Sequence, residues 1–120
     1  GGGHAMARRL EVIAKLWDVV GGTGVGFCLD TCHAHAGGIN MSDVAEKIIG
    51  ITGAINLIHC NDSRDEFDSG RDRHANLGSG SIAVEDILHC IQTAKAPVIL
   101  ETPSEGVTED IALLKNALNK

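Results

Sequence analysis

The chain has 120 residues, of which 43% are hydrophobic and 22% are charged, and its net charge is −6. This composition is typical of one globular domain with an apolar core and excludes a disordered polar chain. No apolar run approaches the roughly 18 residues that a membrane-spanning helix needs, and we expect no signal peptide at the N-terminus. An acidic chain does not bind nucleic acid through its overall charge, because counterion release requires lysine and arginine. Any such contact needs a local site or bound cations.

Apolar positions spaced three or four residues apart predict four helices, within residues 6–20, 44–51, 84–91 and 111–118. Continuous apolar runs predict three buried strands, at residues 25–29, 55–58 and 98–100. We expect a glycine-rich loop after the first strand, Asn40 or Ser42 as the cap of the second helix, and Thr108 as the cap of the last. Residues 61–80 are predicted to form a long loop, and long ordered loops are usually functional.

This order, one helix followed by three strand–helix units, predicts an α/β fold with parallel strands and right-handed crossovers. A closed barrel of this kind needs eight strands and about 250 residues. We therefore expect residues 1–120 to form either a small open sheet or the C-terminal part of a larger barrel.

Each predicted strand ends in a side chain that can bind a metal: Asp30, His59 and Glu101. Active sites of parallel α/β folds lie at the carboxyl ends of the strands, so we expect these side chains to meet. His33 follows Asp30 by three residues, and the pair Asp72 and His74 has the spacing that lets both side chains face one ion. Carboxylates mixed with imidazoles suit zinc, manganese or iron. The alternative for any single one of these residues is a capping or hydrogen-bonding role.

The remaining polar features are less specific. The four cysteines contain no CxxC pair, and we interpret them as small buried thiols in a reduced, cytoplasmic protein. Arg71 and Arg73 share their loop with acidic residues, so a solvated loop and a phosphate-contacting loop remain equally open.

Four segments together resemble endonuclease IV, the zinc-dependent apurinic/apyrimidinic endonuclease family of base-excision repair. They are residues 27–34 (FCLDTCHA), 59–63 (HCNDS), 72–78 (DRHANLG) and 100–103 (LETP). The resemblance covers nearly the whole chain and implies the C-terminal part of a TIM barrel, with the N-terminal half absent. It also implies hydrolysis of the phosphodiester 5′ to abasic sites in double-stranded DNA, with metals that activate water and stabilise the leaving 3′ oxygen.

The same resemblance implies the metal ligands. His33, Asp72 and His74 are similar to the full ligand set of one zinc, and Asp30, His59 and Glu101 to three of the four ligands of a second. Glu101 would act in catalysis through its metal. The intact family holds up to three zinc ions, with manganese as a substitute. Residues 1–6, 67–73 and 104–108 correspond to loops that face DNA, which makes Arg71 and Arg73 candidate DNA contacts.

Two other functions remain open: a sugar isomerase or epimerase of the xylose-isomerase-like barrels, and a non-catalytic metal-binding half-domain. The family is typically monomeric. A half barrel leaves two edges of its parallel sheet unpaired, which favours self-association of this chain. We expect the chain by itself to have little or no nicking activity and no membrane partner.

Overall fold

The computed structural model describes residues 10–71 and 73–118. Its helices are α1 (Leu10–Val20), α2 (Thr31–Ala36), α3 (Val44–Thr52), α4 (Val84–Ala94) and α5 (Val107–Leu118), with a short 3-10 helix η1 (Gly21–Thr23). Its strands are β1 (Cys28–Asp30), β2 (Leu57–Cys60), β3 (Asp62–Ser63), β4 (His74–Ala75) and β5 (Val98–Leu100). Among these described helices, none has the length and apolar character needed to cross a membrane.

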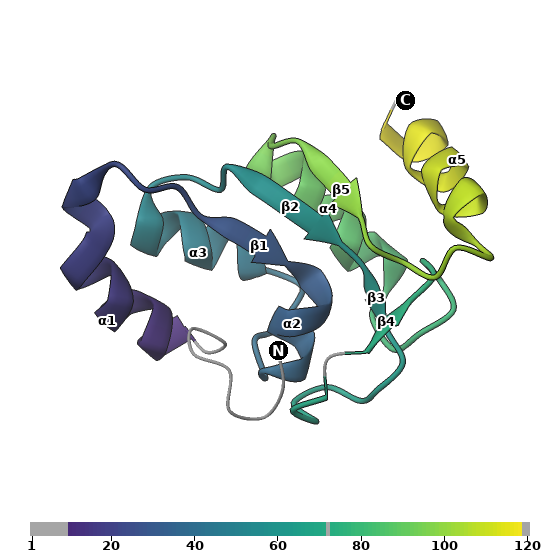
Figure 1. Ribbon diagram of the computed structural model, residues 1–120, viewed down its shortest axis with the longest axis horizontal. Helices are drawn as coiled ribbons and strands as arrows, with labels where there is room; N and C mark the ends of the chain where they lie inside the picture. The colour runs from purple at the N-terminus through teal and green to yellow at the C-terminus, as the bar shows by residue number, and fades with distance from the viewer. Residues whose placement is uncertain (1–9, 72, 119–120) are drawn as a thin grey trace.

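The central sheet has the strand order β1-β2-β5, and all of its pairings are parallel (Figure 1). Asp30 lies opposite His59, and Cys60 lies opposite Leu100, so the three strands end almost level with one another. The predicted α/β class and the three parallel strands are confirmed. The register brings the strand ends, and the residues that follow them, to one edge of the sheet.

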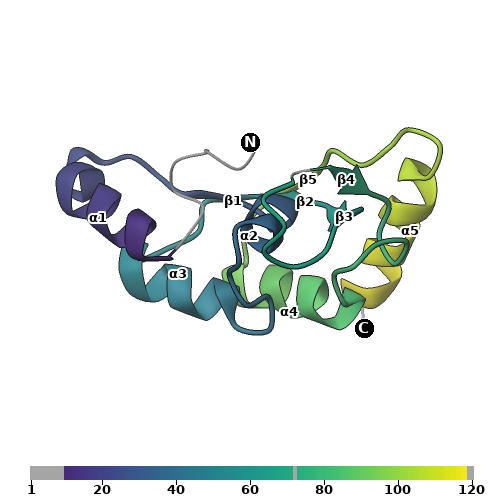
Figure 2. The ribbon, with the colours of Figure 1, turned by 90° about the horizontal axis from the view of Figure 1, so that it is seen from below.

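The core lies between the sheet and the helices α3 and α4, which cover one of its faces (Figure 2). Ile48, Ile58 and Ile87, from α3, β2 and α4, each have 0% of their surface exposed. Side chains alternate along a strand, and the neighbouring Cys28 and Ile99 are exposed. Leu29, which lies between Cys28 and Asp30 on β1, is buried in the core on the opposite face.

Three local predictions are wrong. The segment after β1 forms helix α2, because Asp30 acts as its N-cap and accepts a hydrogen bond from the His33 backbone N–H. Asn40 and Ser42 do not cap α3, since Asn40 accepts hydrogen bonds from the Ser42 backbone and hydroxyl instead. The residue before α3 is Asp43.

Thr108 does not cap the last helix either, because it is the second residue of α5. The helix is fixed at this end by Asp110, whose side chain is 2% exposed. Its carboxylate accepts hydrogen bonds from the Leu77 backbone, the Asn76 side chain and the Thr102 hydroxyl. A buried carboxylate thus ties α5 to two loops of the domain.

The predicted loop at residues 61–80 contains the short antiparallel pair β3 and β4. The fully buried carboxylate of Asp62 accepts hydrogen bonds from the backbone N–H groups of Gly78, Gly80 and Ile82 at 2.9 to 3.0 Å. A Cβ at Gly80 would collide with the Ser63 carbonyl, so this close approach requires glycine. The long loop is therefore ordered around one buried side chain.

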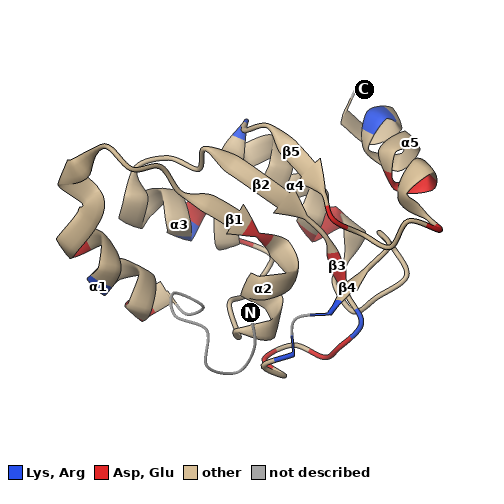
Figure 3. Cartoon of the chain, in the orientation of Figure 1, with Lys and Arg blue, Asp and Glu red and all other residues tan. Residues whose placement is uncertain are grey.

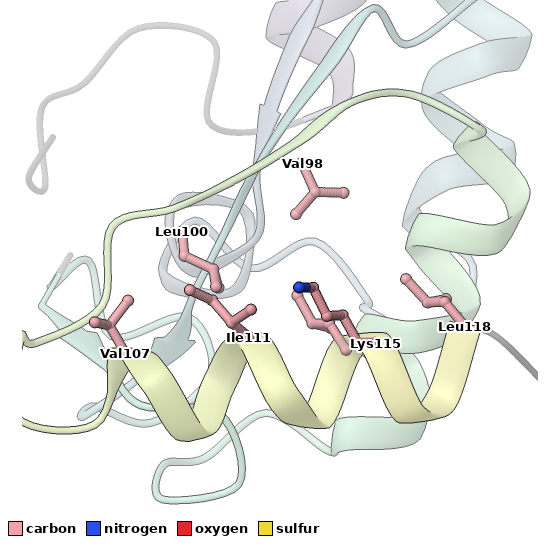
Figure 4. Close-up of a pocket in the computed structure, with 7 residues that line it drawn as sticks. Val98, Leu100, Val107, Ile111, Lys115 and Leu118 are labelled. Atoms are coloured by element: carbon pink, nitrogen blue, oxygen red, sulfur yellow. The ribbon is translucent and has the colours of Figure 1, made fainter.

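An apolar groove separates β5 from α5. It has a volume of about 450 Å³, and Val98 and Leu100 face Ile111 and Leu118 across it (Figure 4). Ile111 is 43% exposed and Leu118 36% exposed, whereas Leu114 is buried. Of these three apolar residues of α5, only Leu114 belongs to the core.

Candidate metal centre

Three predicted ligands converge at the carboxyl edge of the sheet. Asp30 ends β1, His74 begins β4 and Glu101 follows β5, and one potential ligand atom from each lies within 4.8 Å of the others. Asp30 and His74 are partly buried, and Glu101 is exposed. Acidic segments mark the end of β1 and the residues just after β5 in Figure 3. The cluster therefore joins two carboxylates and one imidazole from three separate parts of the chain.

The ring of His74 is oriented by a backbone carbonyl. Its Nδ1 lies 3.0 Å from the carbonyl oxygen of Glu101, which can only accept, so Nδ1 carries the proton. The other ring nitrogen, Nε2, lies 3.6 Å from the Asp30 carboxylate. Metal-binding histidines usually donate their second N–H to a carbonyl or carboxylate, which leaves a lone pair for the ion. His74 has this arrangement.

His59 lies beside the same cluster. Its Nδ1 is 2.9 Å from a carboxylate oxygen of Glu101, and β2 places it directly opposite Asp30. Both side chains of the pair are partly exposed. Asp30, His59, His74 and Glu101 are thus a continuous group of four, which we call the strand-end cluster.

The other two predicted ligands are placed differently. His33, in α2, lines a cavity together with Asp30, at one end of the strand-end cluster. Asp72 lies outside the described residues. The division of the six residues into two zinc sites stays a prediction, since the described group joins His74 to Asp30 and Glu101.

The strand-end cluster fits a transition-metal ion by the chemistry of its donors. Ligands about 2.1 Å from a tetrahedral zinc lie roughly 3.4 Å from one another, so the observed separations require only small side-chain rotations. Carboxylates with imidazoles suit zinc or manganese. The residues present therefore fit the metal that the sequence resemblance implies.

The cysteines contribute no metal ligand to the cluster. The structure places all four outside any disulfide. Desolvation raises the pKa of the Cys28 thiol, and the carboxylates of Asp30 and Glu101 raise it further, so the sulfur stays protonated. Burial raises the pKa of Cys60 and of Cys90 to about 12. Cys28 is exposed, so the prediction that all four are buried is wrong at this position.

The arginine-bearing loop lies between β3 and β4, where basic and acidic segments alternate in Figure 3. The guanidinium of Arg73 donates two hydrogen bonds to Asp65, at 2.6 and 2.9 Å. This pairing holds the pKa of the Asp65 carboxyl below its usual value. Arg71 lines a shallow polar pocket with Arg64, Glu66 and neighbouring residues. Both predicted DNA-contacting arginines therefore lie on one loop, and Arg73 is already paired.

Sequence reasoning assigned no role to Thr31 and Asn61, which are both fully buried beside the strand-end cluster. His35 is buried as well: it is 4% exposed, and its Nε2 lies 3.1 Å from the Asp65 carbonyl oxygen. The available signal for Thr31 and Asn61 was their position, one residue after Asp30 and two after His59. Position alone did not reveal that they contact each other.

Comparison with known proteins places this geometry in a family. The family model described as "xylose isomerase-like TIM barrel" matches residues 1–117. Proteins named "probable endonuclease 4" are 60% identical over 115 residues in Mycobacterium leprae and 58% identical over 115 residues in Mycobacterium tuberculosis. Each match covers 96% of this chain and 46% of the relative, so the chain spans about half the length of these curated relatives.

A solved structure agrees. The crystal structure of endonuclease IV from Thermus thermophilus superimposes with a TM-score of 0.82 at 31% identity, over 99% of this chain and 47% of that one. The resemblance to endonuclease IV seen in the four segments is thereby confirmed, and so is the expectation of part of a TIM barrel. The chain belongs to the xylose isomerase-like TIM barrel family, and its relatives there are endonuclease IV proteins.

Proposed function

We propose that this chain carries part of the active site of a zinc-dependent DNA endonuclease that hydrolyses the phosphodiester 5′ to abasic sites in double-stranded DNA. The observation that carries the proposal is the convergence of Asp30, His74 and Glu101 on one point. The 60% identity to a protein named probable endonuclease 4 supports the same chemistry. Base-excision repair would be the process that supplies this substrate.

The cluster's own charge explains why a cation is needed. Carboxylates at the strand ends repel the phosphates of DNA, so the unmetallated site opposes substrate binding. Bound zinc would supply positive charge for the phosphate and a water of lowered pKa. Asp30 and Glu101 provide the compensating negative charge, and the Glu101 carbonyl holds the His74 ring in the tautomer that leaves Nε2 for the metal.

The proposed ligands are Asp30, His33, His59, Asp72, His74 and Glu101, with Glu101 acting in catalysis through the metal. They would form one complete and one partial site, of the three zinc sites in the intact family, and manganese could replace zinc. Arg71 and Arg73 are proposed to contact DNA, together with the loops at residues 67–73 and 104–108 and with residues 1–6, which lie outside the described residues. The pairing of Arg73 with Asp65 orders the loop but also offsets part of its charge.

We further propose that residues 1–120 act as one partial barrel domain in the cytoplasm, where reduced thiols are expected. The four cysteines outside disulfides support that compartment. The unpaired edges of the sheet favour self-association of the chain in isolation.

Zinc content tests the metal centre directly. We expect about one zinc per chain after dialysis, because three donors are already together, and we expect its loss in His74→Ala. The matched control is His89→Ala, since His89 pairs with Glu46 on α3 at 2.7 Å, away from the strand-end cluster. A folded chain that retains no zinc, or a His74→Ala variant that keeps it, would contradict the proposed centre.

Activity is tested in a chimaera, because the chain covers 46% of its relative. This chain would replace the matched segment of the Mycobacterium leprae protein, and the product would be incubated with a duplex containing one abasic site. We expect nicking on the 5′ side, lost with Glu101→Gln, and little or none from the 120-residue chain alone. Turnover of ketoses instead would indicate an isomerase, and zinc binding without any turnover would indicate a metal-binding half-domain.

A further inference from the structure

A buried hydrogen-bond network crosses the sheet just beyond the point where its backbone ladder ends. The ladder stops at the pairs Asp30–His59 and Cys60–Leu100. Asn61, the next residue after β2, has 0% of its surface exposed, and so does Thr31, the first residue after β1. Two polar side chains therefore lie in the interior between the three strand ends.

Thr31 and Asn61 bond to each other twice. The Thr31 hydroxyl donates to the carbonyl oxygen of Asn61 at 2.6 Å and accepts from its backbone N–H at 2.8 Å. A threonine hydroxyl has one donor and two acceptor sites, so it can serve both contacts together. This double contact fixes the end of β2 against the residue that follows Asp30.

Asn61 then reaches the third strand. Its side-chain oxygen accepts a hydrogen bond from the backbone N–H of Glu101 at 3.0 Å. The carbonyl of Glu101 in turn accepts from His74. Thr31, Asn61 and Glu101 therefore link the backbone next to Asp30, the backbone of Glu101 and the ring of His74.

The amide nitrogen of Asn61 is buried and has no hydrogen-bond partner among the described residues. An unsatisfied buried donor costs free energy of folding. The side-chain oxygen, in contrast, is used in holding Glu101.

The opposite end of the same two strands provides a comparison. There the side-chain oxygen of Asn56 accepts from the Phe27 backbone N–H at 2.8 Å. Asn56 is exposed and joins β1 to β2 only. The two asparagines thus make similar strand-to-backbone contacts, but only Asn61 reaches the edge that carries the ligands.

From this network we propose that Thr31 and Asn61 are positioning residues, which set the spacing of Asp30, His74 and Glu101 and thereby the affinity of the site for zinc. The proposal rests on the proposed metal-dependent function. Neither residue needs to touch the ion, since the network acts on the backbone that carries the ligands. Hydrogen bonds behind metal ligands commonly change metal affinity by about 10- to 100-fold.

The first test needs no metal and uses the 120-residue chain. Thr31→Val removes the hydroxyl at nearly constant volume, and Thr31→Ser keeps it. We expect hydrogen exchange of the Glu101 amide, followed by NMR, to become faster in Thr31→Val, although the Thr31 hydroxyl bonds to Asn61 and the Glu101 amide bonds to the Asn61 side chain. Thr31→Ser and Asn56→Ala should leave this exchange unchanged. Unchanged exchange in Thr31→Val would overturn the network.

The second test measures zinc affinity by competition with a chromogenic chelator. We expect Asn61→Ala to weaken binding by about 10-fold or more, Thr31→Val to weaken it in the same direction, and Thr31→Ser to restore it. Equal weakening in Asn56→Ala would overturn the proposal, because the effect would then follow general stability. If Asn61→Ala fails to fold, the Thr31→Val and Thr31→Ser pair decides the outcome.

Together, the two tests distinguish a failure of the proposed metal centre from a failure of the proposed positioning role. A wild-type chain without zinc affinity would contradict the proposed metal centre, and the amide exchange would still show whether the network exists. Zinc binding that is the same in the wild type, Thr31→Val and Asn61→Ala would leave the centre intact and overturn only the positioning role.

Discussion

Two regions of this molecule fix their helices by different means. Helices α3 and α4 bury Ile48 and Ile87 completely against the sheet. Helix α5 buries Leu114 but leaves Ile111 43% exposed along the groove beside β5 (Figure 4). Its position depends on the buried carboxylate of Asp110 and three hydrogen bonds.

The two regions differ in how completely neighbouring elements cover each helix. Between α3, α4 and β2, apolar side chains are buried against one another, and such burial is the main source of stability in globular proteins. At β5, no further strand pairs with the sheet among the described residues. The position of α5 therefore depends more on the hydrogen bonds of Asp110 than the positions of α3 and α4 depend on polar contacts.

The largest effect on stability is expected in the core between the sheet and helices α3 and α4. Ile58→Ala removes a side chain that is 0% exposed, and such truncations typically lower the free energy of unfolding by about 2–5 kcal/mol. Ile111→Ala, in the groove, is the matched control and should cost less than about 1 kcal/mol. Urea unfolding followed by circular dichroism measures both. Equal losses would show that the groove is as well packed as the core.

Removing the carboxylate of Asp110 should loosen α5 without affecting α3 or α4. Asp110→Ala leaves the Leu77 backbone N–H and the Asn76 and Thr102 side chains without their shared acceptor. Loss of a buried hydrogen-bonded group of this kind costs about 2 kcal/mol. Hydrogen exchange should become faster in α5 and stay slow in α4, whereas uniform acceleration would contradict a local role for Asp110.

The open groove should also govern self-association. Ile111→Lys places a charge in an apolar groove next to the edge strand β5, and charges of this kind oppose edge-to-edge pairing. We expect the wild-type chain to show a concentration-dependent average mass in sedimentation, and the variant to show a smaller one at unchanged helix content. A wild-type chain that stays monomeric at every concentration would contradict self-association through this groove.

The smallest effect is expected in the polar loop. Because Arg73 lowers the pKa of Asp65, the ionised carboxyl is favoured in the folded state. The stabilisation is present above the ordinary Asp pKa of about 4 and is lost as the pH falls through the lowered value. Unfolding measured across this acid range should depend less on pH in Asp65→Asn, and Arg73→Gln should have the same effect. An unchanged pH dependence in both variants would show that the pair does not contribute.

Local pattern explains why much of the fold was predictable. The apolar spacing around Ile48 and Ile87 identified α3 and α4, and the short apolar runs identified the three strands of the sheet. Helix α2 was missed because its six residues are too few for a periodic signal, and the capping hydrogen bond of Asp30 decides it. Thr108 was mistaken for a cap since helix boundaries depend on contacts such as those of Asp110.

The sequence by itself determined the alternation of helices and strands, and it placed Asp30, His59 and Glu101 at the ends of strands, because the 3.6- and 2-residue periods of apolar side chains are local properties. Only the tertiary structure decided that His74 joins Asp30 and Glu101, residues 44 and 27 positions away. It also decided that Thr31 and Asn61 bond behind them. These long-range contacts depend on strand register and on the path of the loop from β3 to β4. Long-range packing determines both, and no local period of the sequence encodes them.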